Sequence, residues 1–295
     1  MRRLAAIALA AVACGAVVAH AQTLSLAYAK GATYHYTLHT TSNLSTDMGT
    51  VSAPVKMDMT AKEAVTVNSV DSKGVADVSL TFSDVHMVMS MTSANSSTHI
   101  DQTQSTFPTL DLEIAPDGRV VSVNGINVMS EMTLGVGGAS SFVIAVLPDT
   151  AVKPGDSWSK SYDQPSPFGT GSTHVTANSK YLRDETFHGV KAAVVETNTS
   201  ANIDLSMTPT QQGAAGGFPG TSIKGKWTTD VTSWIDPSAH RLLKTLMKGT
   251  TDITMTTSVQ PGPPIASADG SPVIPPGISG PFTMKGLSTL DLEPA

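Results

Sequence analysis

Val, Ile and Thr recur along the chain in short runs that alternate between apolar and polar residues, and Gly, Pro, Asn and Asp stand at the breaks between these runs. A period of two is typical of β-strands that bury one face. Thr at the solvent-facing positions keeps a high preference for strands without adding apolar surface. The pattern therefore predicts a mainly β protein, built on an antiparallel sheet with one face in water and one face buried.

The order of turns and strands in the first half of the chain recurs in the second half. Three features recur in this order: a glycine three residues before a large aromatic residue (Gly31 and Tyr34, Gly155 and Trp158), a turn that ends in Gly-Val (Gly74-Val75, Gly189-Val190), and a strand-turn-strand unit (residues 112–120 and 233–242). We interpret these echoes as two pseudo-repeats. Chance similarity between β-rich segments is the alternative.

The two pseudo-repeats are expected over residues 22–147 and 148–260. The first one ends in two apolar stretches, residues 127–134 and 140–147, which predict one or two short helices. Residues 261–281 are rich in proline, which resists both helix and central strand, and they predict an extended connector to a final strand in residues 282–295. The expected fold is an antiparallel curved sheet or half-barrel, with the short helices on its concave side.

The chain begins with the pattern of a secretory signal peptide. Arg2 and Arg3 precede an apolar run over residues 4–19, and Ala19-His20-Ala21 fits a cleavage site. We therefore expect residues 1–21 to be removed and the mature chain to be periplasmic or secreted. No later stretch approaches the roughly 20 apolar residues of a membrane-spanning helix, so no transmembrane span is expected.

Charge and cysteine content restrict the chemistry further. The formal net charge is -6, and Lys and Arg do not cluster, which argues against a nucleic-acid partner. Cys14 is the only cysteine, and cleavage after Ala21 would leave no disulfide and no thiolate site. The residues around Cys14 also resemble a lipoprotein cleavage box, and a chain anchored by lipid through Cys14 is the alternative.

Methionines gather in two segments of the first pseudo-repeat. Thioether sulfur is a ligand for Cu(I), and alternate residues of a strand project from the same face. The internal comparison aligns Met87 with Ile203 and Met89 with Leu205, which are residues typical of a core, and methionine is a common filler there. Core packing is thus the favoured interpretation, and a copper site is the alternative. The candidate ligands are Met57, Met59, Met87, Met89 and Met91.

Other reactive motifs are missing from the sequence. There is no Gly-x-Ser-x-Gly elbow, the histidines lack zinc-site spacing, and no phosphate-binding loop is complete. The neighbouring carboxylates Asp111, Glu113 and Asp117 form no evident catalytic pair, and Asp117 is explained by its turn. We predict a protein without cofactor that is not an enzyme, and a hydrolase with an unfamiliar site is the alternative.

Three turn and strand-start motifs carry a family resemblance. The motifs are Gly31-x-x-Tyr34, the segment from Leu147-Pro148 to Trp158, and Asp236-Pro237-x-x-x-Arg241-Leu242. Together they resemble uncharacterised exported bacterial proteins grouped as a domain of unknown function. The strand pattern is similar, more loosely, to the half-barrels of periplasmic lipoprotein carriers. That similarity implies a concave apolar face able to hold an acyl chain.

The functional prediction is a non-catalytic envelope protein that binds an apolar ligand or a protein partner. Its basis is an outer face rich in Thr and Ser, an apolar inner face and the lack of a recognisable reactive group. A structural or adhesive β module is a further alternative, and flat sheets without a pocket would favour it.

Overall fold

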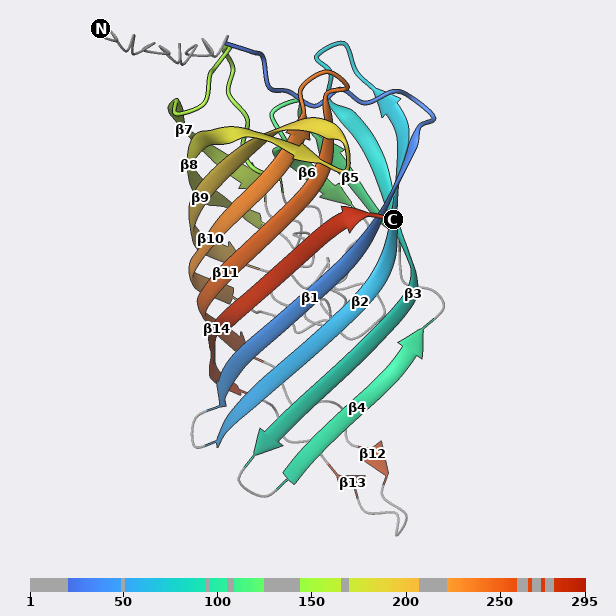
Figure 1. Cartoon of the computed structure of the whole chain (residues 1–295). Coiled ribbons are helices and arrows are strands. Elements are labelled where there is room, and N and C mark those ends of the chain that lie inside the picture. Colours follow the sequence, from blue (N-terminus) through green and yellow to red (C-terminus); the bar gives the residue numbers. More distant parts are fainter. Residues whose placement is uncertain are drawn as a thin grey trace, which may run out of the picture.

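A computed structural model describes residues 21–48, 51–93, 96–104, 109–124, 144–165, 170–206, 222–258, 265–266, 272–273 and 279–295. One antiparallel sheet of twelve strands dominates this part of the chain, and a separate pair of two-residue strands accompanies it (Figure 1). No helix occurs among the described residues, and hence none that could cross a membrane. The prediction of a mainly antiparallel β protein with a curved sheet is confirmed.

The structure contains fourteen strands in the described part of the chain. The first six are β1 (Thr33–Met48), β2 (Val51–Val70), β3 (Ala76–Ser93), β4 (Ser96–Gln104), β5 (Leu110–Ile114) and β6 (Val120–Asn124). The next five are β7 (Ser157–Pro165), β8 (Thr170–Phe187), β9 (Val190–Ser206), β10 (Ser222–Asp236) and β11 (Arg241–Ser258). The last three are β12 (Ile265–Ala266), β13 (Pro272–Val273) and β14 (Ser279–Pro294).

The final strand lies in the middle of the sheet. The order of neighbours is β6-β5-β3-β2-β1-β14-β11-β10-β9-β8-β7, and β4 pairs with the part of β3 beyond β5. Strand β14 is antiparallel to β1 on one side, with Leu292 opposite Leu38, and to β11 on the other, with Leu292 opposite Thr245. It therefore joins two meanders, β1 to β6 and β7 to β11, into one sheet.

The two meanders share turn geometry, although their duplication stays a prediction. A residue with positive φ lies at each of the corresponding turns: Gly31 and Gly155, Gly74 and Gly189, Gly118 and His240. Register shifts also occur close to the ends of β5 and β10, at Glu113/Ile114 and at Trp234/Ile235.

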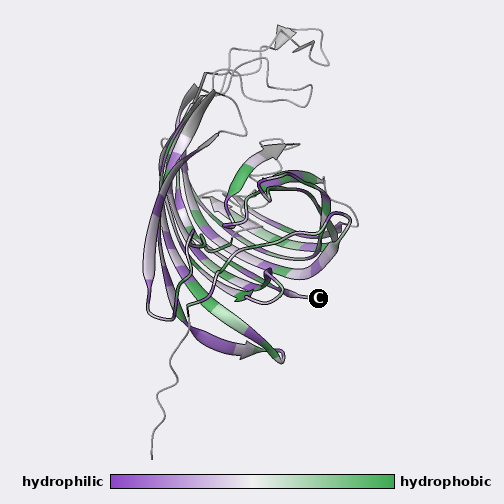
Figure 2. Cartoon of the chain, turned by 90° about the horizontal axis from the view of Figure 1, so that it is seen from above, coloured by the Kyte–Doolittle hydropathy of each residue, from purple (hydrophilic) through white to green (hydrophobic). Residues whose placement is uncertain are grey.

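The sheet curves strongly around one concave side (Figure 2). Two glycines on that side allow neighbouring backbones to approach closely. A Cβ atom added at Gly286 of β14 would lie 2.2 Å from the carbonyl oxygen of Asn43 in β1. One added at Gly225 of β10 would lie 2.3 Å from the carbonyl oxygen of Asp252 in β11. Since real Cβ atoms do not approach so closely, these positions require glycine, a common device where a sheet bends sharply.

The main core fills the upper part of the concave side as oriented in Figure 1. Inward residues of the strands pack there against two segments outside the sheet. Residues 21–32 contribute Leu24 and Leu26, and the segment before β7 contributes Ile144 and Leu147, all nearly free of solvent exposure. Backbone hydrogen bonds between Gln22 and Val152 join the two segments. Residues 21–32 and the segment before β7 therefore cover this part of the sheet.

The helix expected over residues 140–147 is wrong for the residues that the structure describes, which belong to the linker before β7 (residues 144–156). Residues 125–143 lie outside the described part of the chain, together with the helix expected over 127–134, but residues 144–147 form no helix. The amide of Ala145 donates to the hydroxyl of Ser233, and the amide of Val146 donates to the hydroxyl of Thr197. Because inward hydroxyls of the sheet satisfy these buried donors, the apolar run is stable without a helix.

Candidate functional site

The lower part of the concave side carries apolar side chains that the covering segments do not bury completely. They project inward from the strand ends farthest from residues 21–32. One group surrounds Ile253, which is opposite Met284 of β14 and packs with Ile203 and Met255. We name the whole set the lower concave surface. It comprises Leu44, Val55, Met89, Met91, Ile203, Trp227, Ile253, Met255, Phe282 and Met284.

Exposure separates this surface from the core above it. Most of its members are half-buried, and 40% of Met91 is exposed. Core residues farther up the same strands, such as Leu38 of β1 and Val195 of β9, have no exposure at all. Clustered apolar side chains that remain accessible are a typical mark of an interaction site.

The five candidate methionines lie together on the concave side. In the register of β2 and β3, Met57 is opposite Met89, and Met59 is opposite Met87. Met57, Met59 and Met87 belong to the main core, whereas Met89 and Met91 extend it toward the lower concave surface. The sheet therefore brings the two sequence segments together as apolar packing. The copper alternative stays a prediction.

One ionisable side chain in the core was not singled out from the sequence. Glu63 of β2 projects inward between Tyr36 of β1 and Phe82 of β3, and only 1% of it is exposed. Neither carboxyl oxygen has a hydrogen-bond partner among the described residues. Burial raises the pKa of Glu63 to about 8, so the carboxyl group is mostly neutral at pH 7.

The environment of Glu63 explains why no partner reaches it. The hydroxyl of Tyr36 donates a hydrogen bond to the carbonyl oxygen of Leu242 instead. The hydroxyl of Tyr28, on the N-terminal segment above, is also buried without a partner among the described residues. The sequence signal that could have found Glu63 was the alternation of apolar and polar residues, because Glu63 occupies an inward position between Ala61 and Val65.

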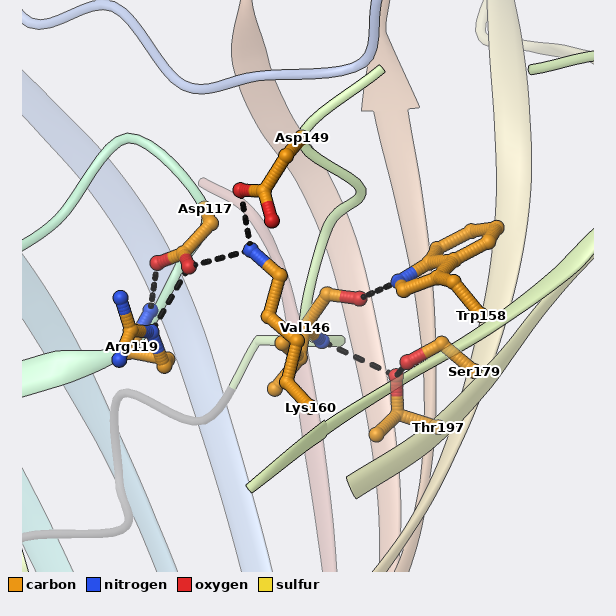
Figure 3. A network of polar contacts seen from close by, with 8 residues as sticks. All are labelled: Asp117, Arg119, Val146, Asp149, Trp158, Lys160, Ser179 and Thr197. Atoms are coloured by element: carbon orange, nitrogen blue, oxygen red, sulfur yellow. Dashed lines mark hydrogen bonds and ion pairs between the residues drawn. The ribbon is translucent and has the colours of Figure 1, made fainter. Parts of the chain in front are cut away.

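A polar network joins the turn between β5 and β6 to β7, where the two ends of the sheet approach each other (Figure 3). The Nζ atom of Lys160 lies 2.7 Å from Asp117 Oδ2 and 2.7 Å from Asp149 Oδ1. Arg119 contacts the same Asp117 oxygen at 2.7 Å and lies over the ring of Tyr162. Burial alone would raise the pKa of Asp117, but hydrogen bonds from Lys160 and Arg119 lower it.

The linker before β7 belongs to the same region. The indole nitrogen of Trp158 donates a hydrogen bond to the carbonyl oxygen of Val146 (Figure 3). The Val146 amide donates to the hydroxyl of Thr197, which also forms a hydrogen bond with the hydroxyl of Ser179. No ladder hydrogen bonds join β6 to β7 in the described part of the chain, so the sheet is not closed. These side chains and the linker therefore hold its two end strands near each other.

Replacing Asp117 with alanine should destabilise the protein by about 2 kcal/mol, because Lys160 would remain largely buried with only Asp149 as a counter-charge. Only 14% of the Lys160 side chain is exposed. Urea unfolding measures the change in free energy.

The matched control for Asp117→Ala is Asp163→Ala. Asp163 pairs with His174 on the exposed face of the same end of the sheet, and this pair should contribute less than about 0.5 kcal/mol. Equal losses for the two variants would contradict a special role for the network.

The remaining candidate groups from the sequence do not converge. His39 pairs with Asp58, and His86 pairs with Asp101, both on the exposed convex face. Asp111 accepts a hydrogen bond from Ser79, while Asp117 serves the edge network. Among the residues that the structure describes, no three His, Cys, Asp or Glu side chains gather as they would around a metal ion.

A comparison with solved structures finds a distant likeness. No protein-family model matches the chain, and no curated protein matches it. A solved structure described as "Lipid-protein interactions in lipovitellin" has a TM-score of 0.43 and 11% sequence identity, with 90% of this chain and 25% of that chain covered. The chain thus spans about a quarter of that protein's length. At this TM-score the likeness carries no argument about function.

Proposed function

We propose that this chain is an exported, non-catalytic binding protein that holds an apolar ligand, such as a lipid acyl chain, against the lower concave surface. The observation that supports the proposal is the accessibility of these inward apolar side chains, in contrast to the covered core above them. Apolar lining on a concave surface is the common composition of small-molecule sites.

The arrangement of the sheet also supports an elongated ligand. Apolar members of the lower concave surface come from strands β1, β2, β3, β9, β10, β11 and β14, side by side across most of the sheet. Gly225 and Gly286 lie among them and let the sheet curve around this surface. A flexible hydrocarbon chain could contact several strands at once, and burial of apolar area would drive its binding.

Titration with a fluorescent fatty acid tests the proposal, and β14 offers a matched pair of variants. Met284→Asp places a charge in the lower concave surface and should weaken binding at least about tenfold, because an unpaired charge next to bound hydrocarbon is costly. Leu287→Asp changes the convex face of the same strand, where 61% of Leu287 is exposed, and should leave the affinity unchanged.

The outcome separates the candidate functions. Equal affinity in both variants would place the fatty acid elsewhere and contradict the proposal. No binding to either variant or to the original protein would favour the alternatives, a protein partner or an adhesive module. Circular dichroism of both variants checks that the sheet is retained.

A further inference from the structure

The outer edge of β4 forms no strand pair within the described part of the chain. Strand β4 pairs with β3 along its whole length, from Val85 opposite Gln104 to Ser93 opposite Ser96. Its other edge has no neighbouring strand among the described residues (Figure 1). A strand edge of this kind presents unpaired backbone donors and acceptors to any chain that can add a further strand.

Protections that proteins commonly place on free edges are missing from β4. Its sequence, Ser-Ser-Thr-His-Ile-Asp-Gln-Thr-Gln, contains no proline and no lysine, and its pairing with β3 shows no bulge. The opposite end of the sheet differs, because β7 ends at Pro165 and Lys160 binds the turn beside β6. The sheet thus protects one border and leaves the β4 border available for pairing.

The side chains of β4 divide cleanly between the two faces. Ile100 is opposite Met89 and lies on the concave side. His99 and Asp101 lie on the convex side, where both are exposed and Asp101 contacts His86 at 2.9 Å. The central part of the strand therefore carries an apolar residue on one face, flanked by a basic and an acidic residue on the other.

We propose that β4 is a homodimer interface, at which a second copy of this chain adds its own β4 in antiparallel orientation around a two-fold axis at Ile100. In this register His99 of each copy is opposite Asp101 of the other. Both charge pairs lie on the convex face, and the two Ile100 side chains meet on the concave face. Opposite charges and apolar side chains are the cross-strand pairs that stabilise a sheet.

The alternation of the strand leaves few other registers. Because directly opposite residues must project from the same face, the two-fold axis can shift only in steps of one residue along the strand. Each step changes which charged residues are opposite each other. An axis at His99 places the two His99 side chains opposite each other. An axis at Asp101 places the two Asp101 carboxylates together. Only the axis at Ile100 pairs opposite charges twice, which argues for one defined dimer.

Native mass spectrometry and sedimentation velocity at about pH 6 test the dimer with two complementary variants. His99→Asp should place a second carboxylate opposite Asp101 in both cross-strand pairs and weaken dimerisation about tenfold. Asp101→His should bring like charges together in the same way. A mixture of the two variants should form a heterodimer with affinity close to that of the original protein, because every pair then joins opposite charges.

His174→Asp is the control, because His174 is also an exposed convex histidine paired with an aspartate, but it lies on β8. It should leave dimerisation unchanged. A protein that stays monomeric at about 100 µM would overturn the proposal, since weak specific complexes still associate at that concentration. Dimerisation that neither β4 variant weakens, or a mixture that gives no heterodimer, would overturn it as well.

Discussion

Replacement of Glu63 with methionine should stabilise the protein, and the stabilisation should grow as the pH rises from about 5 to about 8. Burial raises the pKa of Glu63 to about 8 in the folded protein, from 4.5 for an unperturbed group. Below the lower value the carboxyl group is protonated in both states. Between the two values the unfolded chain releases the proton, while the folded chain retains it.

The sign of the pH dependence follows from that difference. Since only the unfolded state gains from ionisation in this interval, the stability of the original protein should fall by about 1.4 kcal/mol per pH unit there. The whole loss is on the order of 3–5 kcal/mol. Glu63→Met removes this contribution and also removes two unpaired buried oxygens. Methionine has a similar size, and its flexible apolar side chain suits a buried position.

Urea unfolding at several pH values measures the effect, with Glu63→Gln as the control. Glutamine cannot ionise, so this variant should also lose the pH dependence. It should gain less stability than methionine, because its amide remains buried without a partner. An original protein whose stability stays constant from about pH 5 to about pH 8 would contradict the assignment of a neutral buried carboxyl group.

Replacement of Gly286 with alanine should destabilise the protein by about 3 kcal/mol or more, the range of strong core overpacking. The added Cβ atom would lie 2.2 Å from the Asn43 oxygen and 2.7 Å from the Leu44 Cα atom. Both contacts involve backbone atoms of β1, so no side-chain rotation can relieve them. The two strands would have to separate where β14 joins the two meanders.

Gly249 of β11 provides the matched control. It also faces the concave side of a central strand, but a Cβ atom there would lie 3.6 Å from Thr229 and Trp227, an ordinary contact distance. Gly249→Ala should therefore be tolerated or slightly stabilising, because alanine restricts the unfolded chain more than glycine does. Thermal unfolding of both variants tests the contrast. Similar midpoints for the two would show that the curvature does not depend on Gly286.

The alternation of residues was sufficient to predict the sheet, since inward positions such as Leu38 and Val65 are apolar and buried as expected. It could not place β14, because strand pairing depends on contacts between residues far apart in the chain. The apolar run at residues 144–147 misled the helix prediction, since its backbone donors bond hydroxyls of Ser233 and Thr197 instead.

The candidate site was predictable only in part. The methionine segments 57–59 and 87–91 were found from composition, and their direct pairing required the register of β2 and β3. Glu63 was visible as a charged residue at a position where the alternation expects an apolar one. The depth of its burial depends on packing between residues far apart in the chain, which the sequence alone does not give. The exposed part of the concave side could not be separated from the covered part by sequence, because both carry the same apolar pattern.

The central place of β14 imposes an order on folding. Strands β1 and β11 obtain their shared neighbour only after residues 279–294 have been synthesised, since β14 follows every other strand along the chain. Until then β1 and β11 each have one edge without its native neighbour. The incomplete chain could pair such an edge with the wrong strand or with another nascent chain. A chaperone that shields these borders during synthesis would have its main effect before residues 279–294 have been made.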